Sequence, residues 1–280
     1  MASGQISDFM ANFLLSGFAD EIAPDRHQQI ATLKETGVGY LELRGVDGKG
    51  VLDLSAAEID VLRSELDEAG IKVSAIGSPI GKVAIRSDLE EHFERFKVAV
   101  ERAVQFATPN IRVFSFYYKD EDPDACRAAV LAQFERMVSY AADHGCTLLH
   151  ENEKGIYGDV PERCLDLVQS VDHANLRLIF DPANFIQCGV RVKEEAWPLL
   201  ASHVVYFHIK DAEVASGRVV PAGYGDAGVE EILRQAAGAG FVGFLSLEPH
   251  LKADDVDYGG SGVERFVIAV GALRGVLGRL

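Results

Sequence analysis

Four short apolar runs in the second half of the chain each end in a side chain that commonly binds metal ions. The runs end at Glu151, Asp181, His208 and Glu248, with gaps of 30, 27 and 40 residues. A continuous apolar run of this length is typical of a strand buried on both faces, as in a parallel sheet. Because the strands of a parallel barrel all point their carboxyl ends toward one mouth, the pattern predicts that these four side chains converge.

The four side chains form a chemically coherent set. Carboxylate oxygens and an imidazole nitrogen are ligands of hard or borderline divalent metal ions. Each residue taken alone has a simpler explanation, since an acidic residue after a strand is often a helix N-cap and His208 could be a hydrogen-bonded core histidine. Four such residues at equivalent positions of consecutive units favour a metal site. Its predicted ligands are Glu151, Asp181, His208 and Glu248.

The rest of the chain repeats the alternation of an apolar run and a helical pattern. Strands are predicted at 12–21, 39–44, 71–77, 110–116, 146–153, 176–184, 204–211 and 244–250, and helices at 24–37, 55–70, 89–106, 124–144, 161–171, 194–201, 229–239 and 263–280. Eight such units in 280 residues match a single (β/α)₈ TIM barrel, an α/β fold. The predicted division is an N-terminal arm at 1–11 and the barrel at 12–280.

A doubly wound sheet shows the same alternation, so the first strand–helix turn decides between the two folds. In dinucleotide-binding sheets this turn usually carries G-x-G-x-x-G. Here it reads A-D-E-I-A-P-D, and the chain contains no G-x-x-x-x-G-K-[ST] motif either. The single barrel is therefore the predicted architecture.

Charge and composition exclude several classes of protein. The net charge is −16 and the 27 Lys and Arg residues are scattered, which argues against a nucleic-acid partner. No apolar run approaches the ~18 residues of a membrane span, and the first residues lack the basic and apolar regions of a signal peptide. The four cysteines, at 126, 146, 164 and 188, include no C-x-x-C pair. We therefore expect a cytoplasmic protein with free thiols, no membrane contact and no nucleic-acid partner.

The strand ends carry a resemblance to a known family. The sequences L-L-H-E-N-E, I-F-D-P-A-N-F, Y-F-H-I-K-D and L-S-L-E-P-H, with weaker support from G-S-P-I-G-K and G-Y-G-D, resemble the xylose isomerase-like TIM-barrel superfamily. That superfamily comprises sugar-phosphate isomerases and epimerases and includes the type IV apurinic endonucleases. In its ketose 3-epimerases a Glu, Asp, His, Glu set binds one Mn²⁺, Mg²⁺ or Co²⁺ ion. The resemblance implies one such ion here, with Zn²⁺ as a further option, on Glu151, Asp181, His208 and Glu248.

The resemblance also implies a reaction. A divalent ion polarises the carbonyl of an α-hydroxy ketone and makes the adjacent C–H more acidic. Two carboxylates on opposite faces of the substrate can then act as base and conjugate acid around an enediolate. In the related epimerases the two glutamate ligands do this, which here means that Glu151 and Glu248 are the expected catalytic residues. The predicted function is a metal-dependent isomerase or epimerase of sugars or sugar phosphates.

Two further residues are expected beside the metal ligands. Lys210 follows His208 by two residues and His250 follows Glu248 by two, so the period of a strand aims each pair toward the same face. Both are candidates for contact with a substrate hydroxyl. For Lys210 a surface salt bridge with Asp211 is the alternative.

Four more candidates for substrate binding lie at strand ends or in loops. Glu42 closes the second strand, Ser78 opens the polar loop after the third, and Arg218 lies in the long loop of the seventh unit. An arginine is suited to a phosphate or carboxylate, although a solvated loop arginine is the alternative for Arg218. Asn184 stands where the endonucleases have a further metal-binding histidine, which leaves their additional ions without a ligand.

Three other functions remain open at this stage. A metal-dependent dehydratase or lyase acting on a keto-sugar or inosose would use the same carboxylates. A DNA-repair apurinic endonuclease would need further histidines and a basic face, and a non-catalytic sugar-binding barrel would not need all four ligands. The expected partner is a small carbohydrate, and a homo-oligomer is possible.

Overall fold

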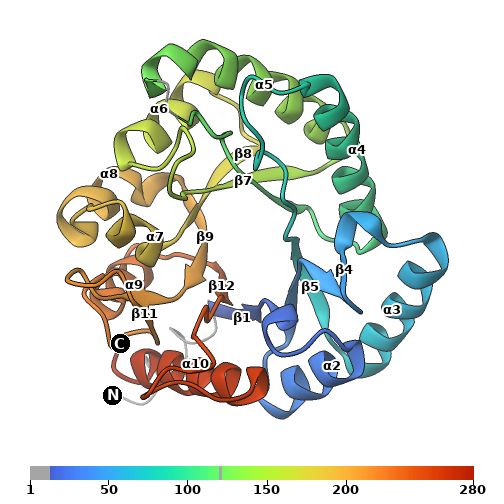
Figure 1. The fold of residues 1–280 in the computed structure, drawn as a ribbon, viewed down its shortest axis with the longest axis vertical. Helices are drawn as coiled ribbons and strands as arrows, with labels where there is room; N and C mark the ends of the chain where they lie inside the picture. Colours follow the sequence, from blue (N-terminus) through green and yellow to red (C-terminus); the bar gives the residue numbers. More distant parts are fainter. Residues whose placement is uncertain (1–12, 120–121) are drawn as a thin grey trace.

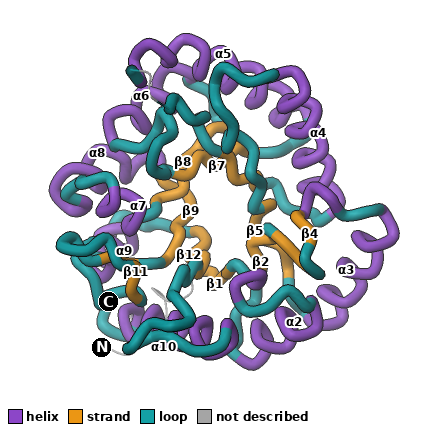
Figure 2. Tube along the Cα trace, viewed as in Figure 1, coloured by secondary structure: helices purple, strands orange, loops and turns teal. Residues whose placement is uncertain are grey.

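The computed structural model describes residues 13–119 and 122–280, and the predicted N-terminal arm lies outside them. Eight parallel strands form a nearly closed barrel with the helices around it (Figures 1 and 2). They are β1 Phe13–Gly17, β2 Tyr40–Leu43, β5 Lys72–Ile76, β6 Asn110–Val113, β7 Thr147–Glu151, β8 Leu176–Phe180, β9 Val204–Ile209 and β12 Gly243–Leu247. The prediction of a single (β/α)₈ barrel is confirmed.

The order of the strands follows the chain around the barrel. Hydrogen-bonded neighbours run β1, β12, β9, β8, β7, β6, β5, β2, so the first and second strands are the two ends of the sheet. These two strands lie against each other and bring the sheet round on itself. All eight carboxyl ends therefore open on the same side.

The helices form the outer ring. They are α2 Arg26–Glu35, α3 Ala56–Ala69, α4 Leu89–Gln105, α5 Pro123–Asp143, α6 Pro161–Val171, α7 Pro182–Gln187, α8 Trp197–Leu200, α9 Val229–Gly238 and α10 Gly262–Leu277. Local chemistry sets many of their ends. Ser55 and Glu58 form a capping box at the start of α3, and Gly70 ends that helix in the left-handed conformation.

One predicted helix differs from the structure. In place of a single helix at 194–201, the chain forms α7, then a π-helical turn at Val192–Ala196 and the short helix α8. Pro198 lies at the start of α8 and has no backbone N–H to donate, which interrupts the regular i to i−4 pattern. The periodicity of the apolar residues did not reveal this interruption.

Two small β-hairpins lie in the loops at the carboxyl ends of the strands. Strands β3 (Gly45–Val46) and β4 (Lys49–Gly50) pair after β2, and β10 (Asp211–Ala212) and β11 (Val219–Val220) pair after β9. Neither hairpin was predicted, because two-residue strands leave no periodic signal in the sequence.

The barrel interior combines a small apolar cluster with a polar chain. Ala75, Leu149, Ile179 and Tyr206, from four different strands, pack together inside the sheet. Beside them the Ser16 and Ser74 hydroxyls lie 2.6 Å apart, and the Ser74 hydroxyl lies 2.9 Å from the Tyr206 hydroxyl. The main apolar core lies between the sheet and the helices.

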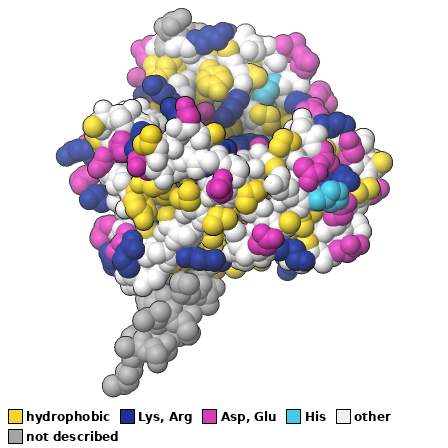
Figure 3. Space-filling view, turned by 60° about the horizontal axis from the view of Figure 1, so that its bottom comes forward, with side chains coloured by type: hydrophobic (Ala, Val, Ile, Leu, Met, Phe, Trp, Pro, Cys, Tyr) yellow, Lys and Arg dark blue, Asp and Glu magenta, His cyan; other side chains and the backbone are white. Residues whose placement is uncertain are grey.

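The surface carries charges of both signs, and most of the cysteines lie in the interior. Figure 3 shows acidic and basic side chains interspersed over the visible face, without an extended basic area. Among the described residues no helix combines the length and apolar character needed to cross a bilayer. Three of the four cysteines, Cys126, Cys146 and Cys164, are buried, and Cys188 is partly exposed.

Candidate metal centre

Four side chains from consecutive barrel strands converge at the carboxyl end of the barrel. Glu151 ends β7, Asp181 directly follows β8, His208 lies near the end of β9, and Glu248 directly follows β12. One potential ligand atom from each lies within 4.8 Å of the others. All four residues are buried, with at most 2% of their surface exposed. The geometric convergence expected from the spacing is therefore present.

The imidazole of His208 is at the centre of this group. Its Nδ1 atom lies 3.0 Å from Glu151 Oε1, 3.6 Å from Glu248 Oε2 and 3.9 Å from Asp181 Oδ2. The three carboxylates thus approach the same ring nitrogen. Three carboxylates and one imidazole make a donor set suited to Mg²⁺, Mn²⁺, Co²⁺ or Zn²⁺.

Glu42 fixes the orientation of that imidazole. Its two carboxylate oxygens each lie 3.2 Å from His208 Nε2, and Oε2 also accepts a hydrogen bond of 2.8 Å from the Tyr206 hydroxyl. With Nε2–H donating to Glu42, Nδ1 is the ring atom that faces the three carboxylates, and it could bind a metal ion once it has lost its proton. A carboxylate that holds the second nitrogen of a histidine ligand is a recurrent feature of metal sites. Glu42 is placed behind the histidine rather than in the open mouth.

Asp181 serves as a helix cap and keeps one oxygen for the centre. Its Oδ1 atom accepts the backbone N–H of Asn184 at 2.9 Å and caps α7. The Asn152 side chain bonds both the N–H and the carbonyl of Asp181, each at 2.9 Å, and so locks its backbone. The N-cap explanation and the ligand explanation of this aspartate are therefore compatible.

Two buried polar atoms in the group have close charged neighbours but no well-formed hydrogen bond. They are Asp181 Oδ2 and His208 Nδ1, the atoms that face the middle of the cluster. Buried polar atoms are almost always satisfied, so such a pair at one point needs an explanation. A divalent cation among the four donors would be bound by both atoms, and the residues present fit such an ion.

Lys210 supplies a positive charge inside the same cluster. Its side chain is only 2% exposed, and its Nζ atom lies 2.8 Å from Asp181 Oδ2 and 2.5 Å from Glu248 Oε2. Although burial disfavours a charged amine, the surrounding carboxylates raise the pKa of Lys210 above its ordinary value. The predicted position beside His208 is observed, whereas the alternative surface salt bridge with Asp211 is not.

Two arginines contact the glutamates, and the sequence analysis assigned neither of them to the site. Arg112 Nη1 lies 3.2 Å from Glu151 Oε2 and 3.8 Å from Glu248 Oε1, so one guanidinium lies beside both carboxylates. Arg44 Nη1 lies 3.1 Å from Glu248 Oε1. Both guanidinium groups also lie over the Phe18 ring, at 4.5 Å for Arg44 and 5.0 Å for Arg112. An arginine inside an otherwise apolar strand was the available signal for Arg112.

The proximity of these charges shifts several pKa values. Burial lowers the pKa of His208, but Glu151 and Glu42 outweigh burial and raise it to about 10. Burial raises the pKa of Glu151, but His208 and Arg112 outweigh it and lower the value to about 2. Burial dominates at Asp181 and raises its pKa to about 6 despite Lys210. The group is thus a set of strongly interacting charges.

The other predicted residues take different places. Asn184 donates to Glu151 Oε1 at 3.3 Å, and His250 Nε2 lies 3.4 Å from Glu248 Oε1, so both adjoin the metal ligands. Arg218 instead contacts three acidic residues of loops outside the metal cluster. The buried Ser78 hydroxyl donates to the Arg112 carbonyl oxygen at 2.5 Å.

A second acidic group adjoins the first. Glu21, from the 3₁₀ turn Ala19–Glu21, joins Glu248 and His250 in a set that could also hold an ion. Burial and the nearby Glu248 charge raise the pKa of Glu21 to about 7. Glu21 accepts the His250 backbone N–H at 2.7 Å, which fixes the loop after β12 against the loop after β1.

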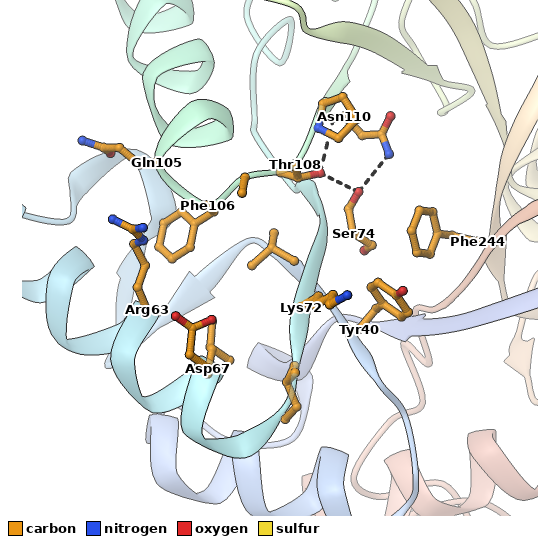
Figure 4. Close-up of a pocket in the computed structure, with 15 residues that line it drawn as sticks. Tyr40, Arg63, Asp67, Lys72, Ser74, Gln105, Phe106, Thr108, Asn110 and Phe244 are labelled. Carbon is orange, nitrogen blue, oxygen red and sulfur yellow. Dashed lines mark hydrogen bonds between the residues drawn. The ribbon is translucent and has the colours of Figure 1, made fainter.

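A different hollow, of about 600 Å³, lies at the opposite, amino end of the strands. Figure 4 shows Phe106 on one side of it and Phe244 with Tyr40 on the other. Its central polar groups bond one another, since the Asn110 and Thr108 side chains both donate to the Ser74 carbonyl oxygen. No group of potential metal ligands was found there among the described residues.

Comparison with known proteins finds relatives of similar sequence and similar fold. The chain is 25% identical over 219 residues to the probable L-ribulose-5-phosphate 3-epimerase of Mycoplasma pneumoniae, a match that covers 74% of this chain and 70% of that protein. The structure of the probable 3-DHS dehydratase AsbF of Bacillus anthracis superposes with a TM-score of 0.74 at 18% identity, over 93% of this chain and 98% of that one.

A metal-containing structure shares the fold as well. The xylose isomerase-like TIM barrel protein of Mycobacterium smegmatis, solved with magnesium, matches with a TM-score of 0.69 at 17% identity, over 94% of this chain and 97% of that one. The sequence model for xylose isomerase-like TIM barrels matches residues 30–262, which is most of the chain. The protein therefore belongs to the family of xylose isomerase-like TIM barrels.

Proposed function

We propose that the protein is a divalent-metal-dependent isomerase or epimerase of a sugar, with Glu151 and Glu248 moving the proton. The observation that carries the proposal is the convergence of three buried carboxylates on the Nδ1 atom of His208, where His208 Nδ1 and Asp181 Oδ2 lack a well-formed hydrogen bond. The relative of similar sequence, a probable sugar-phosphate epimerase, supports the same reaction class.

The residues divide the work between holding an ion and moving a proton. Glu151, Asp181, His208 and Glu248 hold the ion, which when bound polarises the substrate carbonyl and acidifies the adjacent C–H. We expect one ion per chain, since Asn184 stands where a further ligand would be needed. Elemental analysis of protein purified without chelator, giving two or more equivalents that survive dialysis, contradicts this expectation.

The two glutamates are suited to opposite roles in proton transfer. A general base must be unprotonated, and the lowered pKa values of Glu151 and Glu248 keep both carboxylates ionised. Arg112 contacts both, so it can stabilise whichever carboxylate remains charged while the other carries the substrate proton. One glutamate removes the proton, and the other returns one after taking it up from solvent, which inverts the carbon if the two act on opposite faces.

The cations around the glutamates can stabilise negative charge on the substrate. Lys210 presents a buried ammonium group 2.5 Å from Glu248, where it can donate to a substrate oxygen. A fixed positive charge in a buried site stabilises a developing oxyanion more strongly than it would in water.

The same observation on Lys210 favours a second candidate, a dehydratase acting next to a carbonyl. Elimination of water needs a base for the C–H and an acid for the departing hydroxyl. Glu248 or Glu151 can be the base, and Lys210, held protonated beside Glu248, can be the acid. The fold is shared with a probable dehydratase, although at 18% identity that likeness concerns the fold alone.

Deuterium exchange separates the candidates. The metal-loaded protein is incubated in D₂O with a panel of ketoses, inososes and hydroxypyruvate, and NMR follows each C–H next to the carbonyl. An epimerase or isomerase exchanges that hydrogen and yields an isomer of unchanged composition, whereas a dehydratase yields an unsaturated product. Absence of both exchange and elimination across the panel, with metal present, contradicts an enzyme of either class on these substrates.

A further inference from the structure

The loop after β9 resembles an anion-binding loop but is already filled. In TIM barrels a substrate phosphate frequently binds the loops after the seventh and eighth strands, through backbone N–H groups. Here the loop after the seventh barrel strand spans 211–228 and contains Gly223, Gly225 and Gly228. Such glycines let a backbone wrap closely around an anion.

The anion in this loop is the side chain of Asp211. Its Oδ1 atom accepts the N–H groups of Ala212 at 2.9 Å and Ala227 at 3.0 Å, and its Oδ2 atom accepts that of Gly223 at 3.1 Å. Asp211 is completely buried. Donors that could otherwise receive a phosphate are therefore committed to a carboxylate of the chain itself.

The loop backbone closes tightly on this carboxylate. A Cβ atom on residue 225 would lie 2.4 Å from Asp211 Oδ1 and 2.6 Å from the Ala212 carbonyl oxygen. Gly225 is thus required by the close approach of the loop to Asp211. No room is left between them for a second anion.

Arg218, the arginine of this loop, is also engaged. Its guanidinium contacts Asp255 at 2.7 Å, Asp257 at 2.8 Å and Glu213 at 3.4 Å. Asp255 and Asp257 belong to the loop after β12, so Arg218 clamps the loops of the seventh and eighth units together. A phosphate would have to displace several carboxylates to reach it.

Cations nearer the metal centre are paired in the same way. Arg44 contacts Asp20, Glu21 and Glu248, and Lys82 contacts Glu153 at 2.8 Å. Around the centre the carboxyl groups are those of Asp20, Glu21, Glu42, Glu151, Asp181 and Glu248, and the permanently charged cations are Arg44, Arg112 and Lys210. Even with the two positive charges of a divalent ion, the cations do not outnumber the carboxylates around the centre. The centre therefore has no net positive charge to attract an anionic substrate.

We propose that this barrel takes an uncharged keto-sugar, free of phosphate, because Asp211 and the paired arginines occupy the places where a phosphate would bind. The inference rests on the proposed isomerase or epimerase function and narrows its substrate class. It sets the chain apart from its relative, a probable epimerase of L-ribulose 5-phosphate.

Matched pairs of substrates test the inference. The metal-loaded protein is given L-ribulose and its 5-phosphate, and D-fructose and its 6-phosphate, and kcat/KM for C–H exchange in D₂O is measured for each. In any pair that exchanges, we expect the free sugar to have at least a tenfold higher kcat/KM. A phosphorylated sugar that comes within tenfold of its parent overturns the inference and leaves the proposed function standing.

An independent measurement decides the case in which no sugar of the panel exchanges. The melting temperature of the magnesium-loaded protein is followed with inorganic phosphate up to about 10 mM, against chloride at matched ionic strength. A ligand that binds only the folded state raises the melting temperature, so we expect no difference between the two salts. A saturable rise with a midpoint below about 1 mM overturns the inference, whatever the reaction is.

Arg218 offers a matched variant. If Arg218 acts only as a clamp, Arg218→Met lowers kcat/KM for a free sugar and its phosphate ester by the same factor. A selective loss of tenfold or more for the ester shows a phosphate contact and overturns the inference. Arg234→Met is the control, since Arg234 pairs with Glu230 and Glu231 on the outer helix α9.

Discussion

The polar groups at the two ends of the barrel differ in how completely they are hydrogen-bonded. At the amino end, Asn110, Thr108 and Ser74 form a closed set of hydrogen bonds beside the aromatic rings of Figure 4. At the carboxyl end, three carboxylates crowd one imidazole, and Asp181 Oδ2 and His208 Nδ1 remain without a well-formed hydrogen bond. The hollow of about 600 Å³ at the amino end is thus lined by polar groups that bond one another.

The amino-end hollow and the candidate metal centre thus differ in the capacity of their polar groups to bind a ligand. Buried polar groups that satisfy one another stabilise the fold and have little capacity left for a ligand. Unsatisfied groups that converge on one point raise the free energy of the folded protein unless a ligand binds them. A metal centre at the carboxyl ends of the strands would offset that cost when its ion is bound.

The largest effect is expected from the two glutamates at the mouth. Glu151→Gln and Glu248→Gln each retain an oxygen for the metal but cannot accept the substrate proton. Loss of a positioned general base typically lowers the rate by about 10²- to 10⁴-fold, so turnover should collapse even at saturating metal. Metal affinity and turnover are measured separately for each variant on the substrate found by deuterium exchange.

Asp181→Asn is the matched control for this prediction. Its proposed role is coordination alone, so excess metal should restore much of its activity. If the Glu→Gln variants also recover near-normal rates at high metal, neither glutamate is the base, and Lys210 or His250 becomes the better candidate.

The next effect concerns Glu42, which lies between the mouth and the barrel interior. Glu42→Gln weakens the hold on His208 Nε2 without removing any metal ligand. Such supporting partners typically change metal affinity by about 10- to 100-fold, and we expect a loss in this range, measured by titration calorimetry. Equal loss in Tyr206→Phe, which removes only the hydroxyl bonded to Glu42, would show that the whole polar chain rather than the carboxylate charge orients the histidine.

A smaller effect is expected from pH in the metal-free protein. The folded-state pKa values of Asp181, Glu21 and His208 are raised, to about 6, 7 and 10. A raised value means that the folded state binds the proton more tightly than the unfolded chain, so stability falls as pH rises through that value. The lowered pKa values of His250 and His150, about 4 and about 3, act in the opposite direction below about pH 6.5. Chelator-treated protein should therefore lose free energy of unfolding between about pH 7 and pH 10.

Metal is the control for the pH series. A bound divalent ion favours the unprotonated ligands, so the decline should be much smaller in metal-loaded protein. Urea unfolding across the series, with and without Mg²⁺, gives the comparison. Identical pH curves in the two states would mean that no ion binds at these residues.

The sequence predicted the strands and the ligand set, but it did not predict the pairing of charged residues from different parts of the chain. Local apolar runs and their spacing predict the eight strands, the order of the units and the convergence of the four proposed ligands. The roles of Arg112 and Arg218 did not, because Arg112 contacts Glu151 from a different strand and the partners of Arg218, Asp255 and Asp257, come from another loop. Pairings of this kind depend on the three-dimensional arrangement of loops, which has no periodic signature.

Asp211 illustrates the same limit. The sequence analysis considered it as a surface partner of Lys210, whereas the structure buries it in the backbone of its own loop. A short motif such as H-I-K-D places Lys210 and Asp211 side by side in sequence but on opposite faces of the strand end. Only the fold of residues 212–227 reveals what the aspartate binds.

The smallest effect is expected at Ser74, the point where the two ends of the barrel meet. Its hydroxyl bonds Ser16 and Tyr206, and Tyr206 in turn bonds Glu42, behind the proposed metal ligand. Ser74→Ala removes these bonds inside the barrel and should lower the free energy of unfolding by about 1–2 kcal/mol, measured by urea unfolding. Because Glu42 keeps both Tyr206 and His208, metal affinity and turnover should change less than about twofold, well below the effect of Glu42→Gln. A tenfold loss of metal affinity in Ser74→Ala would mean that the amino end and the metal centre are coupled, and the separation between a structural end and a reactive end would have to be abandoned.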